Sequence, residues 1–309
     1  MESSVPISPI LINVQTFDAL YNLSSLTRKL STSKARNQQL ARIRPAVHVA
    51  AEALQHVARY DSMRLQTYRD KENLADRSRI SAIGSTLALR FDDVGYFNRV
   101  YCSDQNFVET LPEIEEFYGG GPFGCTLITP PSDGSDGACI SRAGWVAGHQ
   151  YAWLHHPNCG SIRSDRQTSF DIRAPKSSER EQFLLTYLKA FEAQEDRVPA
   201  ALQNMRHLFD RSELQFLMAW HKGILAGVGI WMRCDEAALL CAGAALPKFR
   251  EMGCHAALLA ARIALAAEAG CRQIYSWAEL GGQSHANMVK AGLETVGTTL
   301  TWCYSPENV

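Results

Sequence analysis

An alanine-rich stretch that follows a polar turn distinguishes the second half of the chain. Eight of the fourteen residues from 256 to 269 are alanine, and Leu259, Ile263 and Ala266 recur at the spacing of one helix face. The segment before the turn, residues 237–246, is short and apolar, as buried strands are. Alanine's small side chain lets a helix approach a sheet closely. The sequence therefore predicts a strand, a turn and a helix that packs tightly on the same sheet.

The turn between that strand and helix carries two cations and a glycine. Lys248 and Arg250 precede Gly253, near which the helix begins. A helix N-terminus exposes backbone N–H groups and carries a partial positive charge, so it suits a phosphate. The turn matches neither the glycine-rich dinucleotide fingerprint nor a Walker phosphate loop. The residues alone thus predict an anion site of modest specificity.

The rest of the chain after the basic extension is predicted to contain both strands and helices. In the second half the residue pattern predicts strands at 169–173, 213–220, 224–233, 237–246, 273–278 and 296–304, with helices at 177–194, from 199 and at 284–290. In the first half it predicts helices at 45–69 and 108–118, with strands at 80–85, 86–91, 96–102, 123–129 and 145–154. Residues 155–167 show no periodicity and are predicted to be a linker. This order predicts an α/β fold with a mixed, mainly antiparallel central sheet flanked by helices.

The length of 309 residues is about twice that of a usual single domain. We expect a basic, flexible extension at 1–44, a first domain at 45–162 and a second at 163–309. The extension contains six basic residues and no acidic one between Arg28 and Arg44. A solvated arm is the default interpretation; a contact for an acidic partner and a transit peptide are the alternatives, and Glu2 and Asp18 weaken the latter.

Composition excludes several classes of function. Thirty-one basic and thirty-two acidic residues give a net charge of −1, so no overall field favours nucleic acid or an anionic membrane. Nine cysteines without a Cys-x-x-Cys pair argue against a disulfide framework or zinc ribbon and favour a reducing, cytoplasmic location. His155, His156 and Cys159 lack partners at metal-ligand spacing, so an exposed loop is favoured there and no metal is expected.

The motif Arg250-x-x-Gly253-x-x-x-x-Leu258, after a strand and before an Ala/Leu helix, resembles the acyl-CoA-binding signature of the GNAT family of N-acetyltransferases. The continuation also resembles the family: a strand, a short helix with Asn287, and then Gly292-Leu293 where the family usually has Gly-Phe. This resemblance covers about residues 165–305. The first half resembles the amino-terminal half of two-domain GNAT proteins more weakly, over residues 97–100 and the order of its elements.

The resemblance implies two GNAT-like domains in tandem, of which only the second binds acetyl-CoA or another acyl-CoA. The first half has no signature of its own and is expected to shape the cleft. In the family, backbone amides of the signature loop hold the pyrophosphate, and the pantetheine arm runs along the strand before it. On this chain these positions are Ala244, Ala245 and Leu246 for the arm, and Arg250, Glu251, Met252, Gly253, Cys254, His255 and Ala256 for the loop.

Ser284 and Asn287 are further candidates for hydrogen bonds to the arm, or else cap or decorate a short helix. The sequence departs from the family at two positions. His255 replaces the third small residue of the signature, and Met288 stands where a tyrosine often protonates the leaving thiolate. Another acid, or water, would have to supply that proton.

The strand after the long helix offers the candidate catalytic residues. If the strand extends through Glu279, alternation places Tyr275, Trp277 and Glu279 on one face. Glu279 is the first candidate base, against the alternative of a solvated loop carboxylate, and Tyr275 is a candidate acid or substrate contact. The implied activity is acyl transfer from acyl-CoA to an amine of a small molecule such as an amino acid. A non-catalytic acyl-CoA sensor and an acetyltransferase for a protein amine are the alternatives, and a homodimer is left open.

Overall fold

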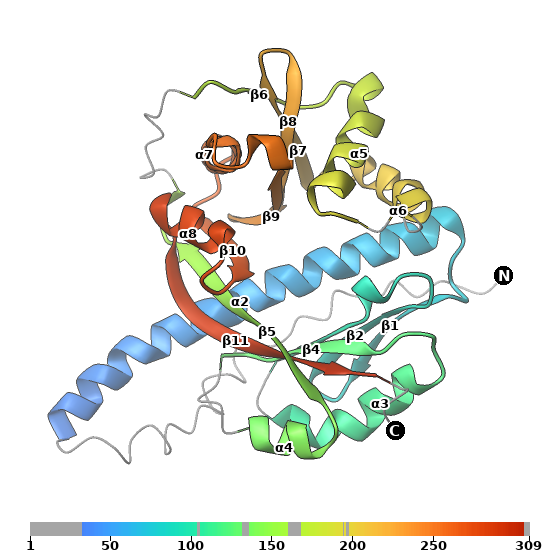
Figure 1. The fold of residues 1–309 in the computed structure, drawn as a ribbon. Coiled ribbons are helices and arrows are strands. Elements are labelled where there is room, and N and C mark those ends of the chain that lie inside the picture. Colours follow the sequence, from blue (N-terminus) through green and yellow to red (C-terminus); the bar gives the residue numbers. More distant parts are fainter. Residues whose placement is uncertain are drawn as a thin grey trace.

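The structure is a computed structural model that describes residues 33–103, 106–131, 136–159, 168–193, 195 and 198–305, with side chains from residue 48 onward except Asn106. The first half of the chain contributes a long helix, five strands and two further helices (Figure 1). These are α2 (Ser33–Glu72), β1 (Ser78–Ile83), β2 (Thr86–Phe91), β3 (Arg99–Cys102), α3 (Leu111–Gly119), β4 (Cys125–Ile128), α4 (Gly137–Arg142) and β5 (Val146–His156). Short 3-10 turns at Gly95–Phe97 and Asn106–Thr110 precede β3 and α3.

The second half contributes six strands and four helices. These are β6 (Asp171–Arg173), α5 (Arg180–Ala190), α6 (Val198–Met205), β7 (Leu214–His221), β8 (Ile224–Cys234), β9 (Ala237–Ala245), α7 (Cys254–Glu268), β10 (Gln273–Glu279), α8 (Gln283–Lys290) and β11 (Glu294–Tyr304). Lys222 and Gly223 connect β7 to β8 with φ values of 50° and 77°, as a tight two-residue hairpin of primed type requires. The predicted meander of β7, β8 and β9 is confirmed.

All strands belong to one eleven-stranded sheet in the order β1-β2-β3-β4-β11-β5-β10-β9-β8-β7-β6. Each half repeats one order of elements: antiparallel strands, a parallel pair linked through a helix, a short helix and a long strand. The parallel pairs are β3 with β4, through α3, and β9 with β10, through α7. This repeat confirms the predicted mixed, mainly antiparallel α/β fold with two similar halves.

The long strand at the end of each half is inserted into the other half. β5 pairs with β10 from Ile274↔His156 to Glu279↔Tyr151. β11 pairs with β4 from Thr301↔Ile128 to Tyr304↔Cys125, and it also runs antiparallel to β5. The two halves therefore share one sheet, and the predicted boundary at 162/163 lies outside the described residues.

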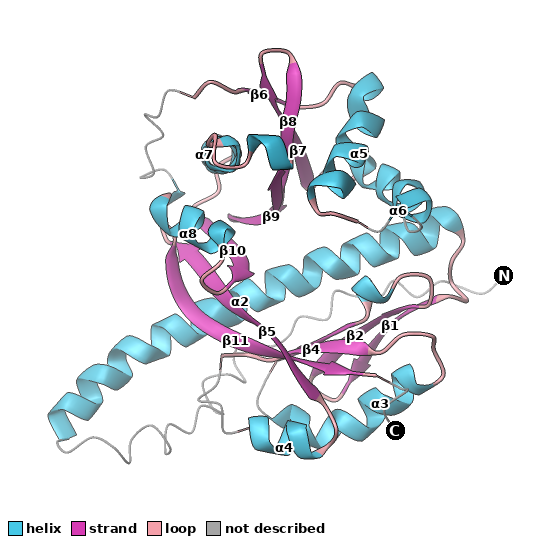
Figure 2. Ribbon diagram, viewed as in Figure 1, coloured by secondary structure: helices cyan, strands magenta, loops and turns pink. Residues whose placement is uncertain are grey.

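Helices cover both faces of this sheet (Figure 2). On one face, α2, α5 and α6 pack on a core that includes Leu54, Leu239 and Tyr275. On the other face, α7 and α8 pack on β9 and β10, while α3 and α4 pack on the strands of the first half. No helix in the described part of the chain is long and apolar enough to cross a bilayer.

The structure corrects two expectations about segment ends. α2 begins at Ser33 rather than at Pro45, so twelve residues of the expected extension are helical. Good helix formers before the proline, such as Ala41, favour continuation although a proline inside a helix removes one backbone hydrogen bond. β5 extends to His156 because the strand pairs with β10, so His155 is buried in the sheet and not in an exposed loop. Most of the predicted linker, residues 160–167, lies outside the described residues.

Glu72, at the end of α2, connects the first half to the second. Its carboxylate accepts hydrogen bonds from Gln203 Nε2 at 2.6 Å and Arg206 Nη2 at 2.9 Å, and it also contacts His207. The hydrogen bonds from Gln203 and His207, with Arg206, lower the pKa of Glu72 to about 2. The ionised carboxylate is therefore part of what holds α2 against the second half.

Replacing this carboxylate should destabilise the protein in a pH-dependent way. We expect Glu72→Gln to lower the free energy of unfolding at pH 7 by about 1 kcal/mol, measured by urea denaturation. The folded pKa is depressed, so this stabilisation is present above the unfolded value of about 4.5 and is lost as pH falls toward 2. The difference between wild type and variant should shrink over that window.

Glu236→Gln is the matched control, because Glu236 forms only an exposed 3.6 Å pair with Arg272 and should change stability little. Equal stability of wild type and Glu72→Gln at pH 7, or a difference that does not depend on pH, would contradict this account of Glu72.

Candidate functional site

The strand before the predicted loop carries a β-bulge. Ile230↔Ala242 and Met232↔Leu239 are paired, so two residues of β9 lie opposite one residue of β8. A bulge bends its strand and increases the local twist. Here it coincides with the point at which β9 separates from its other neighbour.

β9 and β10 pair only at their beginnings. Their parallel register runs from Gln273↔Ala237 to Tyr275↔Leu239, although β9 continues to Ala245 and β10 to Glu279. Beyond this point the two strands no longer pair with each other, which leaves an opening in the sheet. An unpaired strand edge is where an extended ligand can add as an extra strand. Ala244, Ala245 and Leu246, predicted to lie along such a ligand, are at the end of β9 beside this opening.

Arg262 of α7 lies beneath the bulge. Its side chain is fully buried, and its Nη1 donates to the carbonyl of Ala242 at 2.7 Å. Burial lowers the pKa of Arg262 to about 10, so it remains charged at neutral pH. A Cβ at Gly243 would lie 2.5 Å from Nη2, and Gly229 leaves room beside the guanidinium in the same way. The two strand glycines and this arginine together hold the bend in β9.

The predicted phosphate loop leads from β9 into α7. A short 3-10 turn, Pro247–Phe249, is followed by Glu251 and Gly253, whose φ values are 66° and 86°. Positive φ is costly for most residues and is readily adopted by glycine. The first helical hydrogen bond of α7 runs from the Ala257 amide to the Gly253 carbonyl. The amides of residues 254–256, in the first turn, therefore have no carbonyl of the preceding turn to bond to. These amides point out of the helix end next to the opening between β9 and β10.

α8 brings a second set of predicted residues to this helix end. Asn287 Nδ2 donates to His255 Nδ1 at 3.2 Å, and Ser284 lies one turn earlier on α8 and is half-buried. Burial, and then the charge of Arg262, lower the pKa of His255 to about 4, so it is neutral at pH 7. With Nδ1 as acceptor, the proton is on Nε2, which remains available as a donor.

The side chain of Arg250 is directed toward the end of α5. Its Nη2 donates to the Ala190 carbonyl at 3.2 Å and to Glu192 Oε1 at 2.9 Å. Both charged side chains are largely exposed, so this pair contributes little to stability. Glu251 and Met252 are exposed and Cys254 is buried. None of these three side chains is a strong hydrogen-bond donor, so the donors that this part of the loop offers to a ligand are backbone amides.

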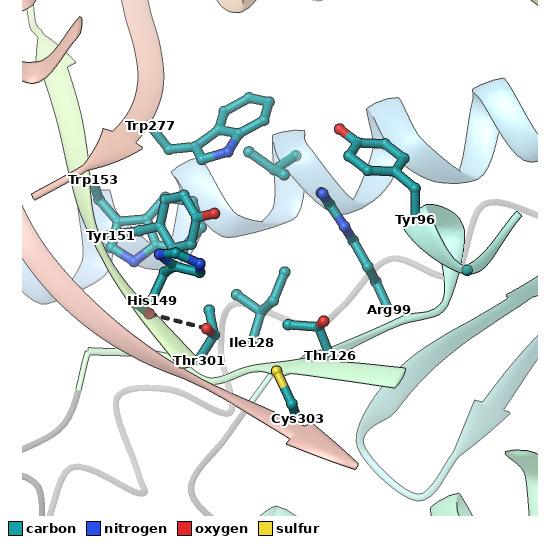
Figure 3. A pocket seen from close by; sticks show the side chains of 12 residues that line it. Tyr96, Arg99, Thr126, Ile128, His149, Tyr151, Trp153, Trp277, Thr301 and Cys303 are labelled. Atoms are coloured by element: carbon teal, nitrogen blue, oxygen red, sulfur yellow. Dashed lines mark hydrogen bonds between the residues drawn. The ribbon is translucent and has the colours of Figure 1, made fainter. Parts of the chain in front are cut away.

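A pocket of about 170 Å³ lies on the α2 face, where the two halves meet (Figure 3). Tyr96, Arg99 and Tyr151 come from the first half, and Trp277 and Thr301 come from the second. Two tyrosines and two tryptophans contribute to its walls, and Arg99 is its one permanently charged lining residue among those described. Trp277 lies on β10 just beyond the end of the β9–β10 pairing, so the pocket adjoins the opening.

The two predicted catalytic residues lie in different surroundings. Glu279 is at the exposed end of β10, with Oε1 3.3 Å from Nδ1 of His149, which lines the pocket. Tyr275 is buried at the paired end of β10, where its hydroxyl donates to Glu52 at 2.5 Å and its ring lies against His155. Burial, with the hydrogen bond to Glu52, raises the pKa of Tyr275 well above its usual value. The structure thus brings Glu279 to the pocket rim and holds Tyr275 against α2.

Several residues of the site were missed in the sequence. His149 and Tyr151 belong to β5, which lies between β10 and β11 only because the two halves exchange strands. Arg99 and Tyr96 reach the pocket for the same reason. The sequence did carry a signal for the bulge, namely Gly229 and Gly243 in the apolar strands and Arg262 as the one arginine of the apolar helix. Met288, which stands where the resemblance implies a tyrosine, is the buried residue of α8 and does not line the pocket.

The corresponding place in the first half is closed. β3 and β4 are four-residue strands that pair at Arg99↔Thr126, Val100↔Leu127 and Tyr101↔Ile128. No opening like that between β9 and β10 occurs between them. In the described part of the chain, no group of three His, Cys, Asp or Glu side chains is placed to hold a metal ion.

The chain's fold is similar to that of several solved structures. A GCN5-related N-acetyltransferase from Kribbella flavida has a TM-score of 0.56 and 16% identity, over 80% of this chain and 95% of that one. One from Sphaerobacter thermophilus has a TM-score of 0.53 and 14% identity, over 76% and 85%. A conserved protein of unknown function from Staphylococcus epidermidis has a TM-score of 0.58 and 11% identity, over 76% and 96%.

At the level of sequence, no protein-family model and no curated protein matches the chain. The structural similarity at these low identities bears on the fold. Together with the internal repeat, it confirms the predicted architecture: the chain has the fold of the GCN5-related N-acetyltransferases, in tandem form.

Proposed function

We propose that this protein is an acyl-CoA-dependent N-acyltransferase that moves an acetyl group from acetyl-CoA to an amine of a small molecule. The observation that carries the proposal is the separation of β9 from β10, which leads directly to the free amides at the start of α7. An unpaired strand edge suits the amide-containing pantetheine arm, and the helix end suits the pyrophosphate. Acetyltransferases with this fold provide supporting analogy.

The residues present fit acetyl-CoA as a substrate. Ala244, Ala245 and Leu246 would flank the arm. In the predicted loop 250–256, the amides of residues 254–256 at the start of α7 would hold the pyrophosphate, because the amides of Arg250 and Met252 already donate within the loop. At the α8 side of the loop the facing side chains carry no negative charge, because His255 is neutral and Asn287 is uncharged. His255 Nε2 and Ser284 are the additional side-chain donors in this proposal.

The reaction requires a neutral amine and a proton acceptor. We assign the acceptor role to Glu279, with His149 beside it at the pocket rim. The amine nitrogen forms a bond to the acyl carbon, the C–S bond breaks, and the amine proton passes to Glu279 directly or through water. The thiolate then takes a proton from solvent, since Met288 cannot supply one. Tyr275 acts as a support that fixes β10 on α2.

Release of free thiol from acetyl-CoA across a panel of small amines tests the proposal. We expect thiol release to depend on the amine and to be matched by an N-acetylated product in mass spectrometry. Tight binding of acetyl-CoA without transfer to any amine would favour a non-catalytic sensor instead. Transfer confined to a protein amine would favour an acetyltransferase that acts on proteins.

Gly253 provides a test of the assigned loop. Alanine at a φ of 86° is strained, so we expect Gly253→Ala to weaken CoA affinity at least about tenfold in isothermal titration. Asparagine tolerates this conformation, so Gly253→Asn should retain more of the affinity.

Gly223→Ala is a matched control, because Gly223 has a φ of 77° and open space around it but lies in the β7–β8 hairpin. Gly223→Ala should lose about as much stability as Gly253→Ala, roughly 1 kcal/mol, and keep the CoA affinity of the wild type. Equal CoA affinity in the two alanine variants would overturn the assignment of the loop.

Glu279→Gln tests the proton acceptor. We expect kcat/KM for the amine to fall by about 10²-fold, with the Kd of acetyl-CoA unchanged, because the amide cannot accept the proton. Glu236→Gln is a matched control, since its carboxylate is similarly exposed and also paired with a neighbouring base. Wild-type turnover in the Glu279→Gln variant would remove Glu279 from the mechanism.

A further inference from the structure

A cluster of two arginines and one aspartate lies between α2 and β3. Asp61 accepts hydrogen bonds from Tyr101 at 2.5 Å, from Arg99 Nη1 at 2.8 Å and from Arg64 Nη1 at 3.3 Å. The side chains of Asp61 and Arg64 are 1% and 4% exposed. Two guanidinium groups share one carboxylate, so the cluster has an excess of one positive charge in a largely buried place.

Within the described part of the chain, Asp61 is the one carboxylate that forms an ion pair with Arg64 or Arg99. Arg64 lies near the rings of Tyr60, Tyr96 and Phe97, and its Nε is buried without a hydrogen-bond partner among the described residues. The Cζ atom of Arg99 lies 4.4 Å from the centre of the Tyr96 ring, and Arg99 donates to Asp61 through Nη1 alone. A buried cation that is incompletely paired is unfavourable, and an anion beside it would be stabilised.

The pocket is the place where such an anion can meet this cluster. Arg99 lines the pocket and, in Figure 3, extends from β3 toward α2 beside Tyr96. Its guanidinium offers a fork of donors that matches a carboxylate. One excess charge also matches a carboxylate better than a phosphate dianion. The aromatic rings of Tyr151 and Trp277 provide an apolar wall for the rest of the ligand.

The proposed proton acceptor, Glu279, lies beside the opposite end of the pocket, next to the lining residue His149. Tyr151, which lines the pocket, is paired with Glu279 in the β5–β10 register, and His149 completes the rim. A ligand held here by a carboxylate at Arg99 can therefore direct an amine toward Glu279. The cation comes from the first half and Glu279 from the second.

We propose that the acyl acceptor is an amine that also carries a carboxylate, as an amino acid does, and that Arg99 binds this carboxylate. The inference rests on the proposed function for its amine end. It assigns the first half, which lacks a cofactor loop, the task of selecting the acceptor.

Matched pairs of acids and amides test this selection. Glycine, leucine and phenylalanine are compared with their primary amides as acceptors, and the ratio of kcat/KM for acid over amide is measured. Amides have a larger fraction of neutral amine at a given pH, so the informative quantity is the change in this ratio between wild type and variant. We expect Arg99→Met to lower the ratio at least about 30-fold, because one partner of a charged pair is removed.

Arg99→Lys should retain part of the preference because it keeps the charge, and Arg142→Met, at an exposed position of α4, should retain all of it. The Kd of acetyl-CoA, measured alongside, should be unchanged in all three variants and shows that each is folded. A ratio that changes less than threefold in Arg99→Met for every pair would overturn the inference while leaving the proposed function intact.

If no amine is acetylated, a binding measurement separates the inferred carboxylate site from the proposed enzymatic function. Trp153 and Trp277 line the pocket, so a bound ligand should change tryptophan fluorescence. We expect N-acetyl-L-phenylalanine to bind wild type at least tenfold more tightly than its amide, and Arg99→Met to abolish the difference. Equal binding of acid and amide, or binding of neither, would overturn the inference; preferential binding without any turnover would support the pocket and contradict the enzymatic function.

Discussion

β5 and β11 bind each other along most of their length, and each also completes the sheet of the opposite half. In each half, a strand of the other half lies between the last strand and the remaining strands. This exchange fixes β10 between β9 and β5, and it places the pocket across the junction. It also explains why two halves with separate helices form one continuous sheet of eleven strands.

A division of tasks follows from this arrangement. The second half has the bulged strand, the opening and the helix end suited to acyl-CoA, held from beneath by the buried Arg262. The first half has a closed parallel pair in the corresponding place, but it supplies α2, Arg99 and the strand that carries His149. In the proposed function, the half without a cofactor loop still contributes residues to the acceptor pocket. The inferred binding of a carboxylate at Arg99 rests on the charge excess around Asp61.

The sequence predicted the fold and the loop better than the pocket. Periodicity located nearly every strand, and the turn at Gly253 marked the helix end, because these signals are local. The start of α2 was misplaced because Pro45 is typical of a helix start yet lies inside the helix. The roles of His149 and Arg99 depend on which strands become neighbours, and strand exchange between distant segments leaves no local pattern.

Hydrogen–deuterium exchange with and without CoA tests most directly whether the opening between β9 and β10 is a ligand site. The exchange of each backbone amide reports on hydrogen bonding at that position. We expect saturating CoA to slow exchange in residues 241–246 and 250–257 and to leave β3 and β4 unchanged. No slowing in those segments, or slowing confined to β3 and β4, would contradict the assignment of the acyl-CoA site to the second half.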